Sequence, residues 1–301
     1  MTTDSVRSGS HSHKQRDLLL ALLAFAVALA LWQVQGLFYL TYPLRLFVTM
    51  IHELGHGLAA ILTGGSFLHF EVTQRGAGLA YTSGGSRFLI IQAGYVGTAL
   101  FGAILLYLTN RVRQPGYVAI ALGLMIGALA LLYSDIGLGA LSLLETALLA
   151  AALIAALYLL FTRETDQGRA LGLAVGAGGL LLAVLLAGIE NLLTLVVGLA
   201  SGLLLIVIGW RGSRTLVLVT LNFLAFLTGL QAITDAWTLF KIVRLPASMM
   251  PFNDAASMAD AYGGTAATWA VYWILLDVII FGLALYITFI RPARRNTARE
   301  S

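Results

Sequence analysis

The sequence has no cysteine among its 301 residues, which excludes disulfide bonds, cysteine-ligated zinc and thiol nucleophiles. Charge is also scarce, because Asp, Glu, Lys and Arg make up only 11% of the chain, whereas about a quarter is usual in a soluble domain. The net charge of +4 does not predict a nucleic-acid interface, since the basic residues are spread over tails and connections rather than gathered on one soluble face. Any metal ion must therefore be held by His, Asp or Glu.

Hydrophobic residues are what the chain has in abundance. They form 59% of it, and the mean hydropathy is +0.89. Uncharged runs recur that reach the roughly 20 residues needed to cross a bilayer. We therefore predict an all-α polytopic membrane protein whose basic connections contact lipid headgroups. About nine transmembrane helices are expected, at residues 18–40, 43–63, 88–109, 116–134, 137–161, 169–188, 191–210, 215–242 and 268–290.

Polar segments divide the chain into a single membrane domain with two tails. We expect a polar N-terminal tail at 1–16, a transmembrane domain at 17–290 and a basic C-terminal tail at 291–301. Residues 66–84 follow the second predicted span. We predict a small β-hairpin there, because polar and apolar residues alternate on both sides of a glycine-rich turn. Residues 243–267 form the other long connection, directly before the last span.

The segment His52-Glu53-Leu54-Gly55-His56 lies within an apolar run. On a helix, His52 and His56 are one turn apart on the same face, with Glu53 beside them. This spacing is typical of helices that hold zinc with two imidazoles while the adjacent carboxylate takes the proton of a water molecule. Because ionisable groups within a membrane span are costly, their presence there indicates a functional site.

A third ligand is expected from a carboxylate at the same depth. In the nine-span scheme His56 and Asp235 each lie seven residues before the end of spans that run in the same direction. At about 1.5 Å per residue, both are roughly 10 Å below one membrane surface. Glu145 and Asp277 fall at a similar level, and Asp277 is the stronger rival of the two. Asp254 lies in the long connection, where a turn or helix N-cap role is the simplest explanation.

Several segments carry a resemblance to a known family. They are His52 to Ala60 followed by Thr63-Gly64-Gly65, the hairpin with its glycine-rich turn, Ala93 to Gly97, an acidic residue near the end of a late span, and Asn253-Asp254-Ala255 with Met258-Ala259. Together they make the chain, from about Leu44 to Trp273, similar to the site-2 protease type of intramembrane zinc metallopeptidase, especially its compact bacterial and plant-like branch.

The resemblance implies a multi-pass protein of a bacterial plasma membrane with Zn²⁺ bound by His52, His56 and an Asp. The Leu-Asp-Gly and Asn-Pro sequences typical of well-studied members are missing here. We therefore take Asp235 as the third ligand, with Asp254 as the alternate because the Asn-Asp-Ala segment recurs in the related branch.

The function expected from the motif is hydrolysis of a peptide bond within or near a transmembrane segment of a membrane-protein substrate. Glu53 would be the general base, and the hairpin would hold a locally unwound substrate by strand addition. Two other classes of function stay open. One is a non-catalytic membrane scaffold with a structural zinc site, and the other is a proton or metal transporter that uses His52, Glu53, Asp235 and Asp277.

Overall fold

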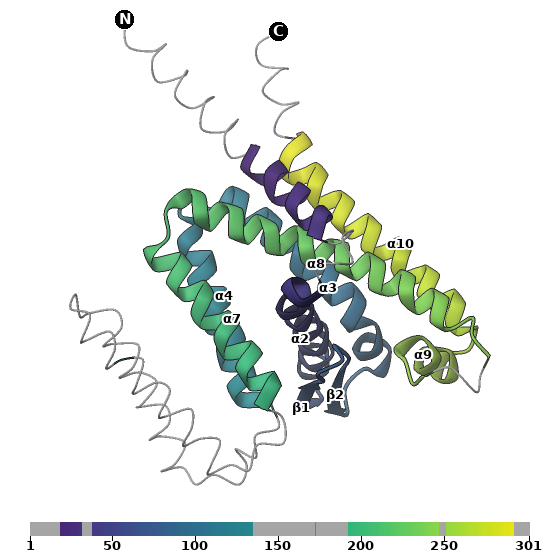
Figure 1. Cartoon of the computed structure of the whole chain (residues 1–301). Coiled ribbons are helices and arrows are strands. Elements are labelled where there is room, and N and C mark those ends of the chain that lie inside the picture. The colour runs from purple at the N-terminus through teal and green to yellow at the C-terminus, as the bar shows by residue number, and fades with distance from the viewer. Residues whose placement is uncertain (1–18, 32–37, 135–171, 173–191, 247–250, 292–301) are drawn as a thin grey trace, which may run out of the picture.

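The computed structural model describes residues 19–31, 38–134, 172, 192–246 and 251–291, and these form helices with one small sheet (Figure 1). After a first helix at Leu19–Leu31, the elements in chain order are α2 (Phe38–Leu62), β1 (Ser66–Val72), β2 (Gly78–Ser83), α3 (Arg87–Arg111), α4 (Pro115–Tyr133), α7 (Leu192–Arg211), α8 (Arg214–Ile242), α9 (Asp254–Tyr262), α10 (Ala266–Leu285) and a π-helical turn η3 (Tyr286–Ile290).

Five helices in the described part of the chain are long and apolar enough to cross a membrane, namely α3, α4, α7, α8 and α10 with its continuation η3. The predicted number of nine spans is not confirmed. The spans expected at 137–161 and 169–188 lie almost wholly outside the described residues. The helix at Leu19–Leu31 is shorter than a span, and α2, although 25 residues long, is not among the five. Its polar residues are the physical reason, because they lower its hydropathy.

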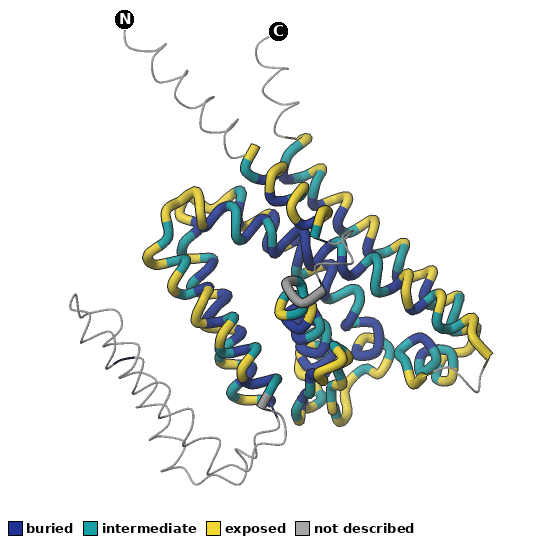
Figure 2. Tube along the Cα trace, in the orientation of Figure 1, coloured by how far each residue is buried: buried dark blue, intermediate teal, exposed yellow. Residues whose placement is uncertain are grey.

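Helices α3 and α8 form the centre of the molecule. Helix α3 packs along α2 and α8, α10 packs against both α3 and α8, and α4 pairs with α7. In the most apolar stretch of α8, 61% of the residues are buried, whereas only 28% are buried in the corresponding stretches of α4 and α10. Figure 2 shows exposed residues along the outer sides of α4, α7 and α10. Apolar side chains exposed there, such as Leu124, Leu275 and Ile279, are what a lipid-facing surface requires.

The predicted β-hairpin is confirmed as an antiparallel pair of β1 and β2 that runs along α2. Its turn is held to the N-terminal half of α2, since the hydroxyls of Tyr42 and Thr49 donate to the carbonyls of Gln74 and Gly76 at 2.8 and 2.9 Å. At the other end the backbone N–H of Ser86 donates to the Thr63 hydroxyl at 2.9 Å. The hairpin is thereby held in a set position over the polar face of α2.

The connection between α8 and α10 contains the short helix α9. The side chain of Asn253 caps it by accepting from the backbone N–H of Ala256 at 2.9 Å, so Asn253, rather than Asp254, has the N-cap role. Ala255 and Met258 are fully buried against Trp273 of α10 and Leu239 of α8. This apolar contact packs α9 against the ends of α8 and α10 and places its first residue, Asp254, near α2.

Candidate metal centre

Helix α2 presents His52 and His56 on one face, as the sequence predicts. The Nδ1 atom of His56 lies 2.7 Å from the carbonyl oxygen of Ile90 on α3. Since a carbonyl only accepts hydrogen bonds, Nδ1 of His56 carries a proton, and Nε2 is the ring nitrogen left to bind a metal ion. A histidine that binds a metal through one ring nitrogen usually donates a hydrogen bond from the other ring nitrogen to an acceptor such as this carbonyl.

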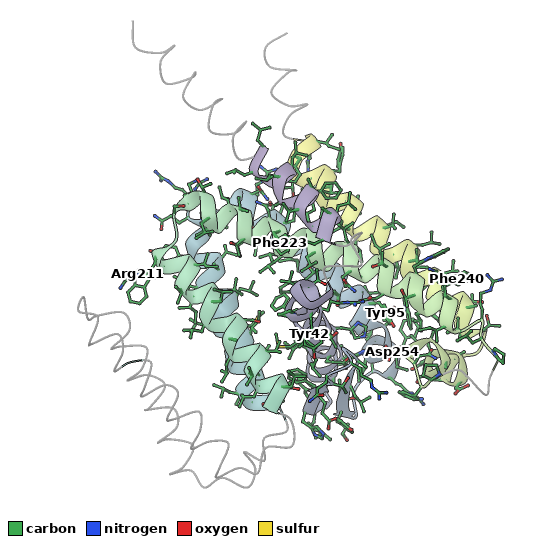
Figure 3. The ribbon with its side chains drawn as sticks, viewed as in Figure 1. Tyr42, Tyr95, Arg211, Phe223, Phe240 and Asp254 are labelled. Atoms are coloured by element: carbon green, nitrogen blue, oxygen red, sulfur yellow. The ribbon has the colours of Figure 1, made fainter. Side chains whose placement is uncertain are left out.

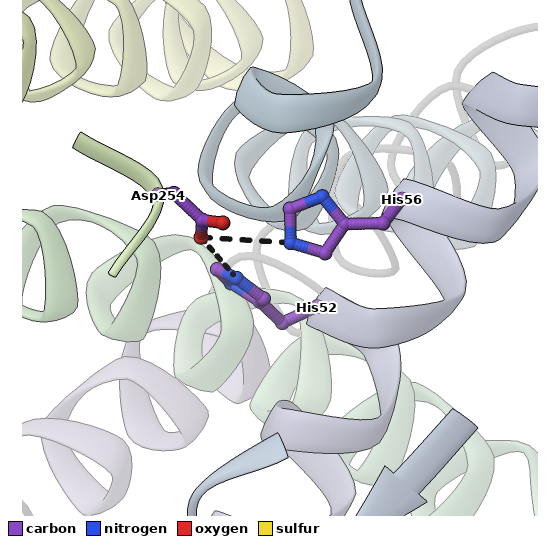
Figure 4. A group of neighbouring side chains, drawn as sticks. All are labelled: His52, His56 and Asp254. Carbon is purple, nitrogen blue, oxygen red and sulfur yellow. Dashed lines mark ion pairs between the residues drawn. The ribbon is translucent and has the colours of Figure 1, made fainter. Parts of the chain in front are cut away.

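Asp254 joins the two histidines from α9. Its Oδ2 atom lies 3.5 Å from Nε2 of His52 and 3.6 Å from Nε2 of His56 (Figure 4). The three residues form the one group of possible metal ligands in the described part of the chain, with ligand atoms all within 4.8 Å of one another. Residues separated by about 200 positions thus converge on one point.

This donor set fits a zinc ion. With bonds of roughly 2.0–2.1 Å, the ligand atoms around a tetrahedral zinc are about 3.3 Å apart, which is close to the two separations given above. Two imidazole nitrogens and a carboxylate oxygen are also the ligands found in catalytic zinc sites that leave a fourth position open. We conclude that the three side chains are suited to hold such an ion.

The Asp254 carboxyl is in the right protonation state for a ligand. Partial burial by itself raises its pKa, but the neighbouring imidazoles of His56 and His52 act in the opposite direction through charge and hydrogen bonding. The balance holds the pKa of Asp254 well below its ordinary value. The group is therefore a carboxylate at neutral pH, which is the form that binds metals.

Glu53 lies next to the ligands on α2 and is 5% exposed. Its carboxylate packs against the backbone of Gly78 at the start of β2, where an added methyl group would come within 2.6 Å of Cγ and 2.7 Å of Cδ. Glycine at this position lets the strand approach the carboxylate closely. A buried acidic group between a strand and a metal-binding cluster is placed as a proton acceptor would be.

Gly94 on α3 makes room for the imidazoles. An added methyl group on Gly94 would overlap Nε2 of both His52 and His56. The neighbouring contact of the helices is also close, since a methyl group on Gly55 would overlap the carbonyl oxygen of Ala93. The backbone of α3 therefore forms one wall of the metal centre.

A cavity of about 880 Å³ opens beside the cluster. The polar stripe of α2, formed by Arg45, Thr49, His52 and His56, lines it together with Glu53. The hairpin turn with strand β2, the N-terminal part of α3, the C-terminal end of α8 and the beginning of α9 contribute the other walls. The cluster is thus accessible from a space large enough for an extended peptide.

Asp235, the preferred third ligand in the sequence analysis, is not part of the group of three. It lines the same cavity, which agrees with the depth argument, but its Oδ1 atom accepts a hydrogen bond of 2.7 Å from the amide of Gln231. The alternate, Asp254, occupies the position against the imidazoles instead. A comparison of depth in the membrane considers only residues of the spanning helices. It therefore missed Asp254, which the connection between α8 and α10 brings back to the histidines.

The other ionisable residues considered from the sequence lie elsewhere. Asp277 is fully buried on α10 and does not belong to the cluster. Glu145 lies outside the described residues.

The sequence analysis assigned no role at the centre to three contributors. The carbonyl of Ile90 leaves no side-chain signal. Gly94 and Tyr95 lie in the segment Ala93 to Gly97, which carries part of the resemblance, but no role at the centre was predicted for either. The ring of Tyr95 meets that of His52 edge to face with centroids 4.7 Å apart.

Comparison with known proteins gives a family for the chain. A family model described as Peptidase M50B-like matches residues 20–161 and 148–284, which together span most of the sequence. Neither the curated proteins nor the solved structures contain a match.

Proposed function

Because the chain belongs to the Peptidase M50B-like family, we propose that this integral membrane protein is a zinc metallopeptidase that hydrolyses a peptide bond within or near a transmembrane segment of a membrane-protein substrate. One observation carries the proposal. His52, His56 and Asp254 converge within coordination reach of a single ion, directly beside the buried carboxylate of Glu53.

Each residue has a distinct task in the reaction. His52, His56 and Asp254 would hold the zinc ion, which when bound would act as a Lewis acid and make a water molecule nucleophilic near neutral pH. Glu53 accepts the proton that this water loses as its oxygen attacks the carbonyl carbon of the peptide bond. When the C–N bond breaks, Glu53 passes the proton to the leaving amine nitrogen. The carbonyl of Ile90 keeps His56 in the tautomer that leaves Nε2 available.

The hairpin offers a binding surface for an unwound substrate. Strand β2 lines the cavity, whereas β1 is covered on its other side, where the backbone N–H of Val72 donates to the Thr194 hydroxyl at 2.8 Å and Phe70 bridges to Ser134. Addition of an extended substrate strand along β2 would bring its backbone past Gly78 and Glu53. A helix must unwind before it can be cleaved, and strand addition satisfies the backbone groups that unwinding exposes.

Burial of Glu53 favours an enzyme over a structural zinc clamp or scaffold. A clamp needs the two imidazoles and Asp254 but gains nothing from a further buried carboxylate, whose desolvation is costly. In a peptidase the same burial is useful, because a desolvated carboxylate is a stronger base.

The test uses the purified full-length protein in detergent with β-casein, an unstructured probe that needs no unwinding. We expect Glu53→Gln to reduce cleavage by roughly 10²–10⁴-fold, the usual contribution of a general base. Zinc content, measured by inductively coupled plasma mass spectrometry, should stay at one ion per chain, because Glu53 is not a ligand.

Glu71→Gln provides the matched control, since Glu71 is a partly exposed glutamate of β1 that does not line the cavity. It should cleave as the wild type does. A Glu53→Gln variant that keeps its activity would refute the mechanism. Bound zinc without any cleavage by the wild type would favour the structural clamp, and proton-coupled uptake into vesicles would favour a transporter.

A further inference from the structure

Hydrolysis of a peptide bond places negative charge on the former carbonyl oxygen. Peptidases stabilise this charge with a hydrogen-bond donor that is already in position, and loss of one such donor costs roughly 10²–10³-fold in rate. Neither the three ligands nor Glu53 can act as this donor, because each has another task. A further polar side chain that lines the cavity can supply this donor.

Three polar side chains of the cavity wall, those of Gln231, Asn253 and Thr49, form hydrogen bonds within the protein. The Gln231 amide donates to Asp235 at 2.7 Å. Asn253 uses its side-chain N–H on the carbonyl of Pro251 at 2.8 Å and its oxygen as the helix cap. On α2, Thr49 donates its hydroxyl proton to the carbonyl of Gly76 at 2.9 Å.

Tyr95 has a hydroxyl that is still available. It lines the cavity, and within the described part of the chain its hydroxyl forms no hydrogen bond. Its ring lies edge to face against His52 with centroids 4.7 Å apart. Figure 3 labels Tyr95 on α3 and Asp254 on α9, and both residues line this cavity.

The position of the Tyr95 ring is set by packing. It stacks on Trp273 of α10 with centroids 5.0 Å apart and an angle of 10° between the planes, and Trp273 is completely buried. The preceding residue, Gly94, holds this part of α3 against the imidazoles. A donor fixed in this way loses little freedom when the reaction begins, which is what stabilisation of a transient charge requires.

We propose that Tyr95 is a catalytic residue that donates a hydrogen bond to the oxygen of the tetrahedral intermediate. This inference rests on the proposed peptidase function. As the water oxygen bonds to the carbonyl carbon, the C=O π pair moves onto the oxygen and the water proton goes to Glu53. Tyr95 keeps its own proton throughout. When the C–N bond breaks, the C=O bond re-forms, the proton on Glu53 moves to the amine nitrogen, and the hydrogen bond from Tyr95 weakens.

Tyr95→Phe tests the proposal, because it removes the hydroxyl and keeps the stacked ring. With β-casein as the probe we expect kcat to fall about 10²–10³-fold, while KM changes less than about threefold and zinc content stays the same. A phosphinic peptide, whose tetrahedral oxygens imitate the intermediate, should bind the variant at least about tenfold more weakly than the wild type.

Tyr107→Phe is the matched control on the same helix. Tyr107 is 43% exposed and its ring faces the guanidinium of Arg111, so kcat and phosphinic-peptide affinity should equal those of the wild type. A Tyr95→Phe variant with wild-type kcat and affinity would overturn the inference while leaving the peptidase function intact. Loss of zinc from Tyr95→Phe would also overturn it, since the residue would then only support His52. An inactive wild type would instead refute the proposed function itself.

Discussion

Two pairs of helices in this protein pack through glycine, with different consequences. In the pair α4 and α7, Gly123 and Gly202 face each other, and a methyl group on either one would overlap the carbonyl oxygen of the other. Gly116 and Gly209 repeat the arrangement. This reciprocal contact between backbones is the usual reason for small residues between membrane helices.

In the pair α2 and α3 the space beside glycine is occupied by functional groups. Gly55 lets the two backbones approach at the carbonyl of Ala93, but the space at Gly94 holds the Nε2 atoms of both histidines. Glycine at a helix contact therefore allows close backbone packing between α4 and α7, whereas between α2 and α3 it makes room for the candidate metal ligands. The difference lies in the partner across the contact, and the glycine itself does not reveal it.

The largest expected effect comes from Gly94→Ala. The added methyl group overlaps both imidazoles, so at least two ligands must shift. We expect zinc affinity to fall more than about 1,000-fold, well beyond the roughly 10–100-fold cost of losing a supporting group. Competition with a chromophoric chelator measures this directly. Wild-type affinity in Gly94→Ala would remove the distinction between the two helix pairs.

The choice of third ligand comes next in size. Because Asp254 Oδ2 lies 3.5 and 3.6 Å from the two imidazole nitrogens, Asp254→Asn should weaken zinc binding more than about 100-fold. Asp235→Asn, which changes a group bonded to Gln231, should weaken it less than about tenfold. The same chelator competition ranks the two variants, and the reverse order would restore Asp235 as the ligand.

The smallest effect is expected in the other helix pair. Gly123→Ala should lower the free energy of unfolding by about 1–3 kcal/mol, the usual cost of overpacking, measured as a lower midpoint of thermal inactivation in detergent. The folded protein should still bind one zinc per chain. Gly127→Ala on the same helix is the control, since an added methyl group there meets nothing within 4 Å and alanine favours a helix. Loss of zinc in Gly123→Ala would show that the two pairs are coupled.

Much of the architecture could be predicted from local pattern. The apolar runs predicted the long helices α3, α4, α7, α8 and α10, and the alternation around Gly76 to Gly78 predicted the hairpin. The predicted number of nine spans was not confirmed. Helix α2 combines the length of a span with polar residues, so hydropathy alone classifies it poorly.

The positions of His52, Glu53 and His56 on one turn of helix follow from the chain alone, because a spacing of four residues is a property of the helix and needs no tertiary contact. Which carboxylate faces them depends on how distant segments pack together. The path of the connection after α8 depends on the burial of Ala255 and Met258 against Trp273 and Leu239, and such contacts between distant segments have no periodicity. For the same reason the sequence does not distinguish Gly94 from Gly123, since both are glycines of apolar helices. Gly94 faces the two imidazoles, whereas Gly123 faces the backbone of Gly202.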